Sequence, residues 1–274
     1  MTTITSLQNA RVKDTVRLRD RRHREKQQRI VIDGFRELTR AIRSGLAMLE
    51  VFVCEPLLGD ERTAELTAML GESSAEILPV AEPVFQKLAF GNRAEGVLGV
   101  AEMPRPVLSD LQLPDNPLVA VLEQVEKPGN IGAVLRSADG AGISALIVAD
   151  AATDLYNPNA IRASLGTIFT LPVCSATSGE TLDWLRHRGM AIYATRVDGS
   201  VPYTQVDYRR PAAVVLGSEA EGLSAAWSTD EVTAVSVPML GMADSLNVSA
   251  TAAVLFYEAL RQRNVVSLSR RNHK

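Results

Sequence analysis

Five short apolar runs without polar alternation recur through the second half of the chain, and they constrain its fold more than any other feature. The runs are LVAVLE (118–123), ALIVAD (145–150), MAIYAT (190–195), AAVVLG (212–217) and VTAVSV (232–237), and helical stretches separate them. Apolar strands that alternate with helices are typical of a parallel sheet covered on both faces. Ligands of such sheets bind at the carboxyl ends of the strands, so chemistry is expected in the loops that follow these runs.

A proline-rich segment precedes these runs, with four prolines in the fourteen residues from Pro104 to Pro117. Because proline removes a backbone donor and favours extended chain, the segment predicts a break between domains. We expect an N-terminal domain over 1–102, a linker over 103–117 and a second domain over 118–274. The N-terminal domain is predicted to be a small α/β unit, with helices around 8–26, 33–44, 60–71 and 82–89 and strands at 51–55, 77–80 and 96–103.

Composition excludes several classes of protein. No stretch approaches the roughly 20 uninterrupted apolar residues of a membrane span, and the first residues lack the charged-then-apolar order of a secretory signal. We therefore expect a cytoplasmic protein with no membrane partner. Cys54 and Cys174 each lie in a short apolar run and are expected to be buried thiols. The three histidines belong to no HExxH motif or Cys/His cluster, which argues against a metal site and against Ser-His-Asp hydrolysis.

Basic charge is concentrated at the front of the chain. Residues 1–45 carry twelve Lys or Arg against five acids, whereas residues 46–117 carry four bases against twelve acids. Such a run is either a solvated helix face or a surface that contacts phosphates, where clustered cations gain affinity by releasing counterions. For the second alternative, the candidate RNA contacts are Arg11, Lys13, Arg21, Arg22 and Arg24.

The first loop of interest follows the 118–123 run and reads EQVEKPGNIGAVLR. Asn130 is suited to cap the next helix, and Arg136 lies nearly two turns along that helix. Taken alone, Asn130 could be only a cap and Arg136 only a surface cation. The segment lacks GxGxxG, which counts against an ordinary dinucleotide or Rossmann methyltransferase site.

Two further loops combine glycine with small polar side chains. VLGSEAEGLS (215–224) ends a strand in a turn where Gly217 and Gly222 permit a tight path and Glu219 supplies a carboxylate. No Gly-Lys-Ser/Thr is present, so this is not a P-loop. VPMLGMADSLNVS (237–249) leads into a helix over 248–263, and its polar side chains could equally satisfy helix-end amides. That helix carries an apolar stripe made of Val248, Ala252, Leu255, Ala259 and Leu260.

Together the three loops closely resemble the SpoU/TrmH family of RNA ribose 2′-O-methyltransferases. The shared motifs are N-x-G-x-x-x-R, L-G-S-E-x-x-G-L-S and V-P-M-x-G-x-x-x-S-L-N-V-S, followed by a helix that ends in YEALRQR, all within 118–263. The front of the chain, from SLQNARVKD to ELTRAI, is similar to the substrate-binding domain of members that modify ribosomal RNA. The resemblance covers nearly the whole chain.

The resemblance implies an α/β fold of the SPOUT type, with a parallel sheet whose C-terminal part forms a deep trefoil knot, preceded by a small α/β RNA-binding domain. It also implies that the three loops hold S-adenosylmethionine in a pocket of backbone amides and apolar side chains. The implied cofactor-binding residues are Thr195, Leu216, Gly217, Val237, Met239, Leu246 and Ser249.

Methyl transfer to a ribose oxygen requires that the two reactants be aligned and that the hydroxyl lose its proton. The resemblance assigns Arg136 to this task. Because a guanidinium stays protonated, we expect Arg136 to bind the adjacent phosphate and stabilise alkoxide charge, with the proton acceptor unassigned. The residues expected to orient Arg136, the ribose and the cofactor are Asn130, Glu219, Ser245 and Asn247. The resemblance further implies a homodimer through the 248–263 helix, whose stripe would need a partner surface.

Two alternatives stay open at this point. One is a tRNA ribose methyltransferase, although the tRNA-directed relatives typically carry short terminal helices in place of a separate N-terminal domain. The other is a non-catalytic RNA-binding protein of the same fold. The complete set of motif side chains favours an enzyme, and the first hundred residues favour ribosomal RNA, most of all that of the large subunit, as its substrate.

Overall fold

The structure is a computed structural model that describes residues 2–71, 73–90 and 95–271, with the side chains of the last helix described as far as Asn264. The chain divides into two compact units. The units are Met1–Pro104 with Tyr156–Thr170, and Arg105–Leu155 with Leu171–Lys274. The first break, after Pro104, falls within the expected linker. The return of Tyr156–Thr170 to the first unit has no counterpart in the expected boundaries.

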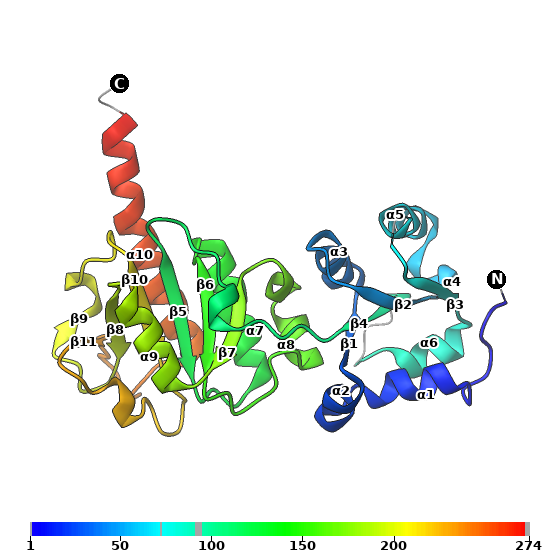
Figure 1. The fold of residues 1–274 in the computed structure, drawn as a ribbon, viewed down its shortest axis with the longest axis horizontal. Coiled ribbons are helices and arrows are strands. Elements are labelled where there is room, and N and C mark those ends of the chain that lie inside the picture. The colour runs from blue at the N-terminus through cyan, green and yellow to red at the C-terminus, as the bar shows by residue number, and fades with distance from the viewer. Residues whose placement is uncertain (1, 72, 91–94, 272–274) are drawn as a thin grey trace. The chain divides into compact units, whose positions relative to one another are not determined.

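The first unit is built on a four-stranded sheet of mixed direction (Figure 1). Its order is β1 (Arg29–Asp33), β4 (Val97–Glu102), β2 (Met48–Val53) and β3 (Glu76–Pro79). β4 is antiparallel to both of its neighbours, and β2 is parallel to β3. The predicted strands correspond to β2, β3 and β4, whereas β1 was missed because RIVID follows directly on a charge-rich helix.

Helices flank this sheet at the four predicted stretches and at two further places, and the stretch predicted over 8–26 forms two helices. They are α1 (Ala10–Arg17), α2 (Arg21–Gln27), α3 (Phe35–Arg43), α4 (Glu55–Leu58), α5 (Asp60–Leu70), α6 (Glu82–Leu88) and, from the returning segment, α8 (Pro158–Ala163) and the 3-10 turn η2 (Thr167–Phe169). One core cluster joins Val12 of α1 and Phe85 of α6 to Phe52 and Leu98 of the sheet. α8 packs against β1, and Ile161 is buried there, so residues distant in sequence complete this unit.

The second unit contains a seven-stranded sheet in which every pairing is parallel, as predicted. Its order is β7 (Val173–Ala176), β6 (Ala145–Ala149), β5 (Leu118–Glu123), β10 (Ala212–Leu216), β8 (Ala191–Thr195), β11 (Val232–Ser236) and β9 (Val201–Pro202). The five apolar runs form its five central strands. The edge strands β7 and β9 are the two that were not predicted, and they span only four and two residues.

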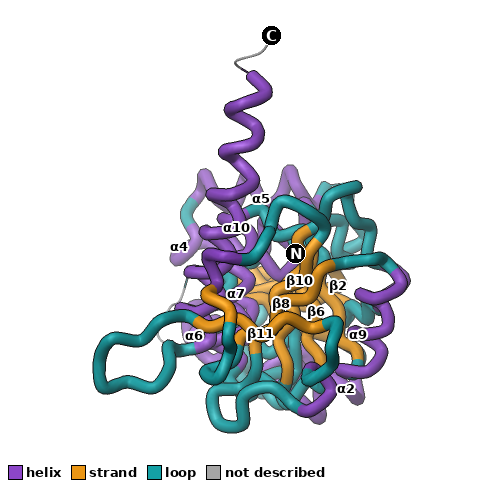
Figure 2. Tube along the Cα trace, turned by 90° about the vertical axis from the view of Figure 1, so that its left-hand side faces the viewer, coloured by secondary structure: helices purple, strands orange, loops and turns teal. Residues whose placement is uncertain are grey.

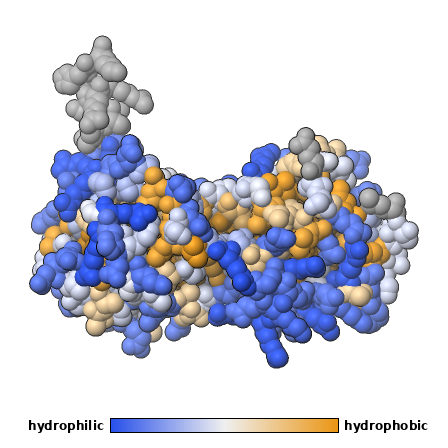
Figure 3. Space-filling view, in the orientation of Figure 1, coloured by the Kyte–Doolittle hydropathy of each residue, from blue (hydrophilic) through white to orange (hydrophobic). Residues whose placement is uncertain are grey.

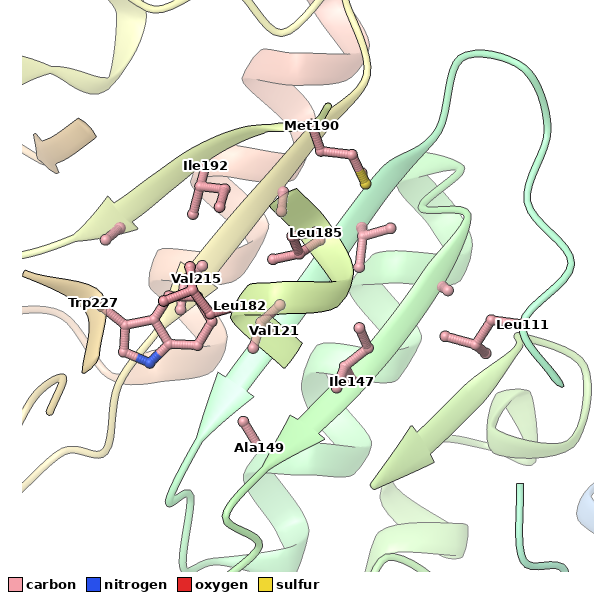
Figure 4. Close-up of a cluster of buried hydrophobic side chains, with 14 of the residues drawn as sticks. Leu111, Val121, Ile147, Ala149, Leu182, Leu185, Met190, Ile192, Val215 and Trp227 are labelled. Carbon is pink, nitrogen blue, oxygen red and sulfur yellow. The ribbon is translucent and has the colours of Figure 1, made fainter. Parts of the chain in front are cut away.

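Helices cover both faces of this sheet (Figure 1). They are α7 (Pro128–Ala141), α9 (Ser178–His187) and α10 (Val248–Arg271), with the 3-10 turns η1 (Leu108–Asp110), η3 (Tyr203–Gln205) and η4 (Ala225–Trp227). On the α9 side, Leu182 and Leu185 pack with Val121, Ile147 and Trp227 in one cluster of buried side chains (Figure 4). Removal of this much apolar surface from water is the main favourable term in the folding of the unit.

The long helix α10 packs along α7 and then continues beyond the rest of its unit (Figure 2). Its apolar stripe is covered within the chain: Val248, Ala252, Leu255 and Ala259 are buried, and only Leu260 is half-buried. The expectation that this stripe needs a partner surface is therefore wrong. A partner subunit, if present, must use other side chains.

Arg263 fixes the position of α10 at the far end of the sheet. Its guanidinium donates hydrogen bonds to four carbonyl oxygens, those of Tyr208 (2.8 Å), Asn116 (2.9 Å), Pro117 (3.0 Å) and Arg210 (3.1 Å). These carbonyls belong to the segments that lead into β5 and β10. Burial lowers the pKa of Arg263 from its ordinary value. A planar group with five donors suits this task better than a lysine.

Within the described part of the chain, no helix is long and apolar enough to cross a membrane. The same residues contain no group of three or more His, Cys, Asp or Glu side chains placed to hold a metal ion. Cys54 and Cys174 are free thiols and both are buried, as predicted.

Candidate active site

The three loops singled out in the sequence meet at the carboxylate of Glu219, which follows β10. Asn130, in the first turn of α7, donates to Oε1 of Glu219 (2.9 Å), and Lys127 donates to Oε2 (2.8 Å). Asn247, just before α10, also donates its amide to Oε1. One carboxylate therefore accepts hydrogen bonds from both of the other loops. These bonds stabilise the charged form and, with Lys127 as the largest cause, lower the pKa of Glu219.

Asn247 has two roles that the sequence alone left as alternatives. Its Oδ1 accepts from the backbone N–H (2.9 Å) and the hydroxyl (2.6 Å) of Ser249, so the residue caps α10. Its Nδ2 meanwhile faces Glu219. The cap holds the side chain in the orientation that the Glu219 contact needs. Ser249 therefore supports Asn247, and it does not line the cleft described below.

The turn after β10 depends on Gly217. Ser218 and Gly222 exchange backbone hydrogen bonds of 3.0 and 3.1 Å, which folds the turn back on itself. A Cβ atom at Gly217 would lie 2.2 Å from the backbone of Gly222, closer than any real side chain tolerates. Gly222 has φ +68°, in the left-handed region. Both glycines are thus required by the path of the backbone.

A buried carboxylate anchors the far end of the same turn. Glu123, the last residue of β5, is fully buried. It accepts hydrogen bonds from the backbone N–H (2.7 Å) and hydroxyl (2.7 Å) of Ser224 and from the hydroxyl of Ser178 (2.5 Å). Sequence analysis missed Glu123 by taking it as the end of an apolar run. A carboxylate at the carboxyl end of a central parallel strand was the available signal.

Beside this turn lies a cleft of about 810 Å³, formed by the loops after β8, β10 and β11. Six of the seven predicted cofactor-binding residues line it, namely Thr195, Leu216, Gly217, Val237, Met239 and Leu246. Glu219 and Ser245 line it as well. Its size and its mixture of apolar side chains with loop backbone suit a small organic molecule.

Arg136 stands apart from this cleft. It is exposed on α7, and its side chain has no hydrogen bond or ion pair with any residue that the structure describes. Asn130, nearly two turns before it, contacts Glu219 instead. It lies inside the first turn of α7, whose N-cap is Lys127, so the interpretation of Asn130 as a cap was wrong. Of the predicted catalytic residues, Asn130 and Asn247 thus bond to Glu219, Ser245 lines the same cleft, and Arg136 does neither.

The five predicted RNA contacts have different surroundings. Arg24 is fully buried and donates to the carbonyl oxygens of Leu18 (2.7 Å) and Arg19 (2.8 Å), so its charge is not presented to a ligand and its assignment as an RNA contact was wrong. Arg11 and Arg21 are exposed but paired with acids, Glu76 at 2.6 Å and Glu25 at 2.7 Å. Lys13 and Arg22 are exposed, with no ion pair among the described residues.

Comparisons with known proteins identify the family that has this fold and these loops. The SpoU rRNA Methylase family matches residues 117–257, a segment that contains all three loops. The chain belongs to the SpoU family. This confirms the resemblance inferred from the three motifs. A second family, the MRM3-like substrate binding domain, matches residues 9–99, most of the first unit.

Individual members of the SpoU family extend the match over both units. The chain is 36% identical over 195 residues to the 23S rRNA (uridine(2479)-2′-O)-methyltransferase of Streptomyces viridochromogenes, which covers 69% of this chain and 68% of that protein. A solved RNA 2′-O ribose methyltransferase is 41% identical and has a TM-score of 0.82, with 96% of this chain and 99% of that chain covered. The SpoU methyltransferase AviRb from S. viridochromogenes, solved with AdoMet, is 30% identical with a TM-score of 0.84 over 93% and 98% of the two chains.

Proposed function

We propose that this SpoU-family protein transfers a methyl group from S-adenosylmethionine to a ribose 2′-oxygen of large-subunit ribosomal RNA. The observation that carries the proposal is the meeting of three motif loops at Glu219 beside a cleft that the predicted cofactor residues line. Relatives named as 23S rRNA 2′-O-methyltransferases, and the AdoMet-bound structure of one relative, support the substrate and the cofactor. The proposal includes a cytoplasmic location, with which the ribosomal RNA substrates named for the relatives are consistent.

The cleft fits the cofactor in size and chemistry. Its volume of about 810 Å³ is within the usual range for small-molecule sites, and Leu216, Val237 and Leu246 offer apolar contacts for a purine ring. The turn from Gly217 to Gly222 lines the cleft, and hydrogen bonds between Ser218 and Gly222 hold its backbone in place, so the turn offers a fixed backbone surface to a ligand. S-adenosylmethionine supplies an activated methyl group on a sulfonium sulfur, so the protein's own task is alignment and proton removal.

The hydrogen bonds at Glu219 give each nearby side chain a task in that alignment. Its carboxylate fixes the side-chain amides of Asn130 and Asn247, and through Asn247 the start of α10. Arg136 offers a cationic, planar guanidinium, so its proposed task is to bind phosphate and to stabilise negative charge on the ribose oxygen. A free, exposed guanidinium is suited to a polyanionic substrate that arrives from solvent.

The proposal includes a homodimer and a site shared between its subunits. Two observations support it. Arg136 does not line the cleft of its own chain. Exposed apolar side chains also gather near α10: of the seven large hydrophobic residues exposed in the described chain, four are Leu240, Met242, Leu246 and Tyr257. Exposed apolar residues close together in sequence are typical of a subunit interface.

The trefoil knot is part of the same proposal. β10 lies between β5 and β8 in the sheet although it follows both in sequence, and α10 then packs on α7. This order is compatible with a threaded C-terminal segment. Limited proteolysis under refolding conditions is a suitable check, because a knotted segment should become protected only after the rest of the second unit.

Methyl transfer from radiolabelled S-adenosylmethionine tests the proposed function. Protein-free large-subunit ribosomal RNA should accept label at one ribose, and tRNA should accept none. Alkaline hydrolysis then leaves an uncleaved dinucleotide at the modified position, because a methylated 2′-oxygen cannot attack the neighbouring phosphate. Label in tRNA alone would favour the tRNA-directed alternative, and cofactor binding without any transfer would favour a non-catalytic protein.

Mixed dimers test the shared site. Arg136→Ala subunits and Gly217→Trp subunits, carrying different tags, are each expected to have little activity alone, because the first lacks the guanidinium and the second has an indole ring in its cleft. If the active site combines Arg136 of one subunit with the cleft of the other, the mixed dimer regains one working site of two. Purified heterodimers that stay inactive would show that each chain uses its own Arg136.

A further inference from the structure

Most cations in the basic front of the chain are engaged within the protein. Five of the twelve Lys and Arg residues of 1–45 pair with acids, namely Arg11, Arg17, Arg21, Arg36 and Arg43. Three others donate to backbone carbonyls, namely Arg19, Arg24 and Arg40. Their charge is held by local structure, so composition overstates how much of this region is available to a polyanion.

The remaining four are exposed and have no ion pair with any described residue. They are Lys13, Arg22, Lys26 and Arg29. Three of them, Arg22, Lys26 and Arg29, fall within eight residues, on α2 and at the start of β1. We call these three side chains the α2 patch. Figure 3 shows hydrophilic side chains gathered over this part of the first unit.

Local structure presents this patch on a rigid element. Residues four apart lie on the same side of a helix, so Arg22 and Lys26 share one side of α2, and Arg24 points to the opposite side. Arg24 is fully buried there and ties α2 to the last carbonyls of α1. Asp20 caps the N-terminus of α2 through the N–H of Arg22 (2.8 Å). The inward arginine thus orients the outward pair.

Arg29 extends the patch onto the edge of the sheet. It begins β1 and lies opposite Glu102 in the ladder with β4. No ion pair within 4.0 Å joins the two side chains, so Arg29 remains available, although Glu102 reduces the local potential. Arg22 and Lys26 are therefore the centre of the patch, and Arg29 is its rim.

The side chains of the patch are cationic and have no apolar neighbours on α2, which favours a phosphate backbone as the binding partner. The sequence of α2, RRHREKQ, contains no apolar side chain, and none of the large hydrophobic residues exposed in the described chain falls between Leu7 and Val107. Protein interfaces need an apolar centre, and membrane surfaces reward apolar insertion, so both fit poorly. Unpaired cations at helical spacing instead gain affinity by displacing counterions from a nucleic acid.

We propose that the α2 patch is the surface through which the first unit holds the sugar-phosphate backbone of the substrate RNA. The proposal rests on the proposed function only for the identity of the RNA. It also predicts that the engaged arginines of the same region contribute little to RNA affinity, although they carry the same formal charge.

A pair of matched double variants tests this assignment. Arg22→Ala/Lys26→Ala removes two unpaired cations, and Arg17→Ala/Arg21→Ala removes two exposed cations that are paired with Asp14 and Glu25. Both change the net charge by the same amount. The probe is protein-free large-subunit ribosomal RNA, bound in filter assays over a series of KCl concentrations. Circular dichroism and thermal melts confirm that both variants are folded.

We expect the patch variant to bind RNA on the order of tenfold more weakly and to lower the slope of log affinity against log salt by about two. The paired control should lose less than half of that slope. Equal losses in both variants would show that only net charge matters and would overturn the proposal. Unchanged binding in the patch variant would overturn it as well, since the patch would then be solvated surface or a site for another class of partner.

Methylation kinetics separate this inference from the proposed function. The patch variant should raise KM for RNA while kcat at saturating RNA and the Kd for S-adenosylmethionine stay unchanged. If the wild-type protein binds RNA through the patch but methylates none, the proposed function fails and the patch stands. If it methylates ribosomal RNA while the patch variant keeps the wild-type KM and salt slope, the patch fails and the proposed function stands.

Discussion

The two units use their charged side chains in different ways. In the second unit, carboxylates organise the site: Glu219 joins three loops, and Glu123 anchors the turn that carries it. In the first unit, arginines organise the fold by capping helices, as Arg19 does for α6 and Arg24 for α1. The role of a charged side chain in this protein therefore follows from the group to which it bonds, and the density of charge around it is a poorer guide.

The largest expected effect concerns Arg136, the cation of the motif loops whose side chain has no partner among the described residues. Arg136→Ala removes charge stabilisation of the transition state and no contact in the cleft, so we expect methyl transfer to fall by about 10²–10³ with S-adenosylmethionine binding unchanged. Single-turnover kinetics and calorimetric titration measure the two effects. Arg210→Ala, an exposed arginine of the same unit, is the control and should retain full activity. Loss of cofactor binding in Arg136→Ala would place this side chain in the cleft.

Substitution of Gly217 has the next largest expected effect, a loss of cofactor affinity. Gly217→Ala puts a Cβ atom 2.2 Å from the backbone of Gly222, so the turn must shift. We expect cofactor affinity to fall by about five- to 150-fold, as overpacking by about 1–3 kcal/mol implies. Gly241→Ala is a matched control in the loop before α10, because nothing lies within 4 Å of its Cβ position. A folded Gly217→Ala protein with normal affinity would show that the cofactor lies elsewhere.

The sequence predicts the strands of the second unit better than the packing of the first unit, for a physical reason. A fully apolar strand must be buried on both faces, so the five runs of the second unit were recognisable, and the adjoining loops carried the motif residues. β9, with two residues, and Glu123, at the end of an apolar run, left no comparable pattern. In the first unit, the burial of Arg24 depends on how α2 meets α1, and no periodicity encodes that packing.

Tertiary packing also decides the outcome for two longer segments. The sequence of α10 predicts a free apolar face. In the structure α10 packs along α7, and Ala252 and Leu255 are buried within the same chain. Residues 156–170 follow the second strand of the second unit in sequence but belong to the first unit, where Ile161 is buried. Removal of residues 1–104 would therefore expose Ile161, and the truncation that tests an N-terminal domain must account for this segment.

Glu123 is a carboxylate that supports the site indirectly, because it holds Ser224 at the end of the turn that carries Glu219. Glu123→Met keeps its length but leaves the N–H of Ser224 without an acceptor, so we expect a loss of about 1–3 kcal/mol in unfolding free energy and a severalfold weaker cofactor affinity. Glu123→Gln should recover most of both, since one amide oxygen still accepts from that N–H. Glu126→Gln, exposed in the same loop, should change neither quantity. Equal losses in the Met and Gln variants would mean that the charge itself is required.

The last expected effect leaves the site intact and concerns two carboxylates whose pKa values shift in opposite directions. Burial raises the pKa of Asp33, at the end of β1, to about 6, although the N–H of Phe90 and the charge of Arg162 oppose the shift. Between the ordinary pKa of 3.8 and about 6, the folded first unit holds a proton that the unfolded chain has lost. Its stability should therefore fall as pH rises through this window and stay level above it. Glu219 behaves in the reverse sense: its stabilising contacts persist at neutral pH and are lost only as pH falls below its ordinary range.

Asp33→Asn isolates the first of these effects. The amide oxygen can still accept from the N–H of Phe90 but carries no charge, so the variant should be more stable than the wild type near neutral pH by about 1–3 kcal/mol and equal to it near pH 4. Urea unfolding of both proteins between about pH 4 and pH 7 gives the difference. Cofactor affinity over the same interval should remain level above the ordinary pKa of Glu219, because Lys127 keeps that carboxylate ionised. A variant whose stability declines with pH as steeply as the wild type would show that Asp33 is ionised without penalty, and the two units would then treat their carboxylates alike.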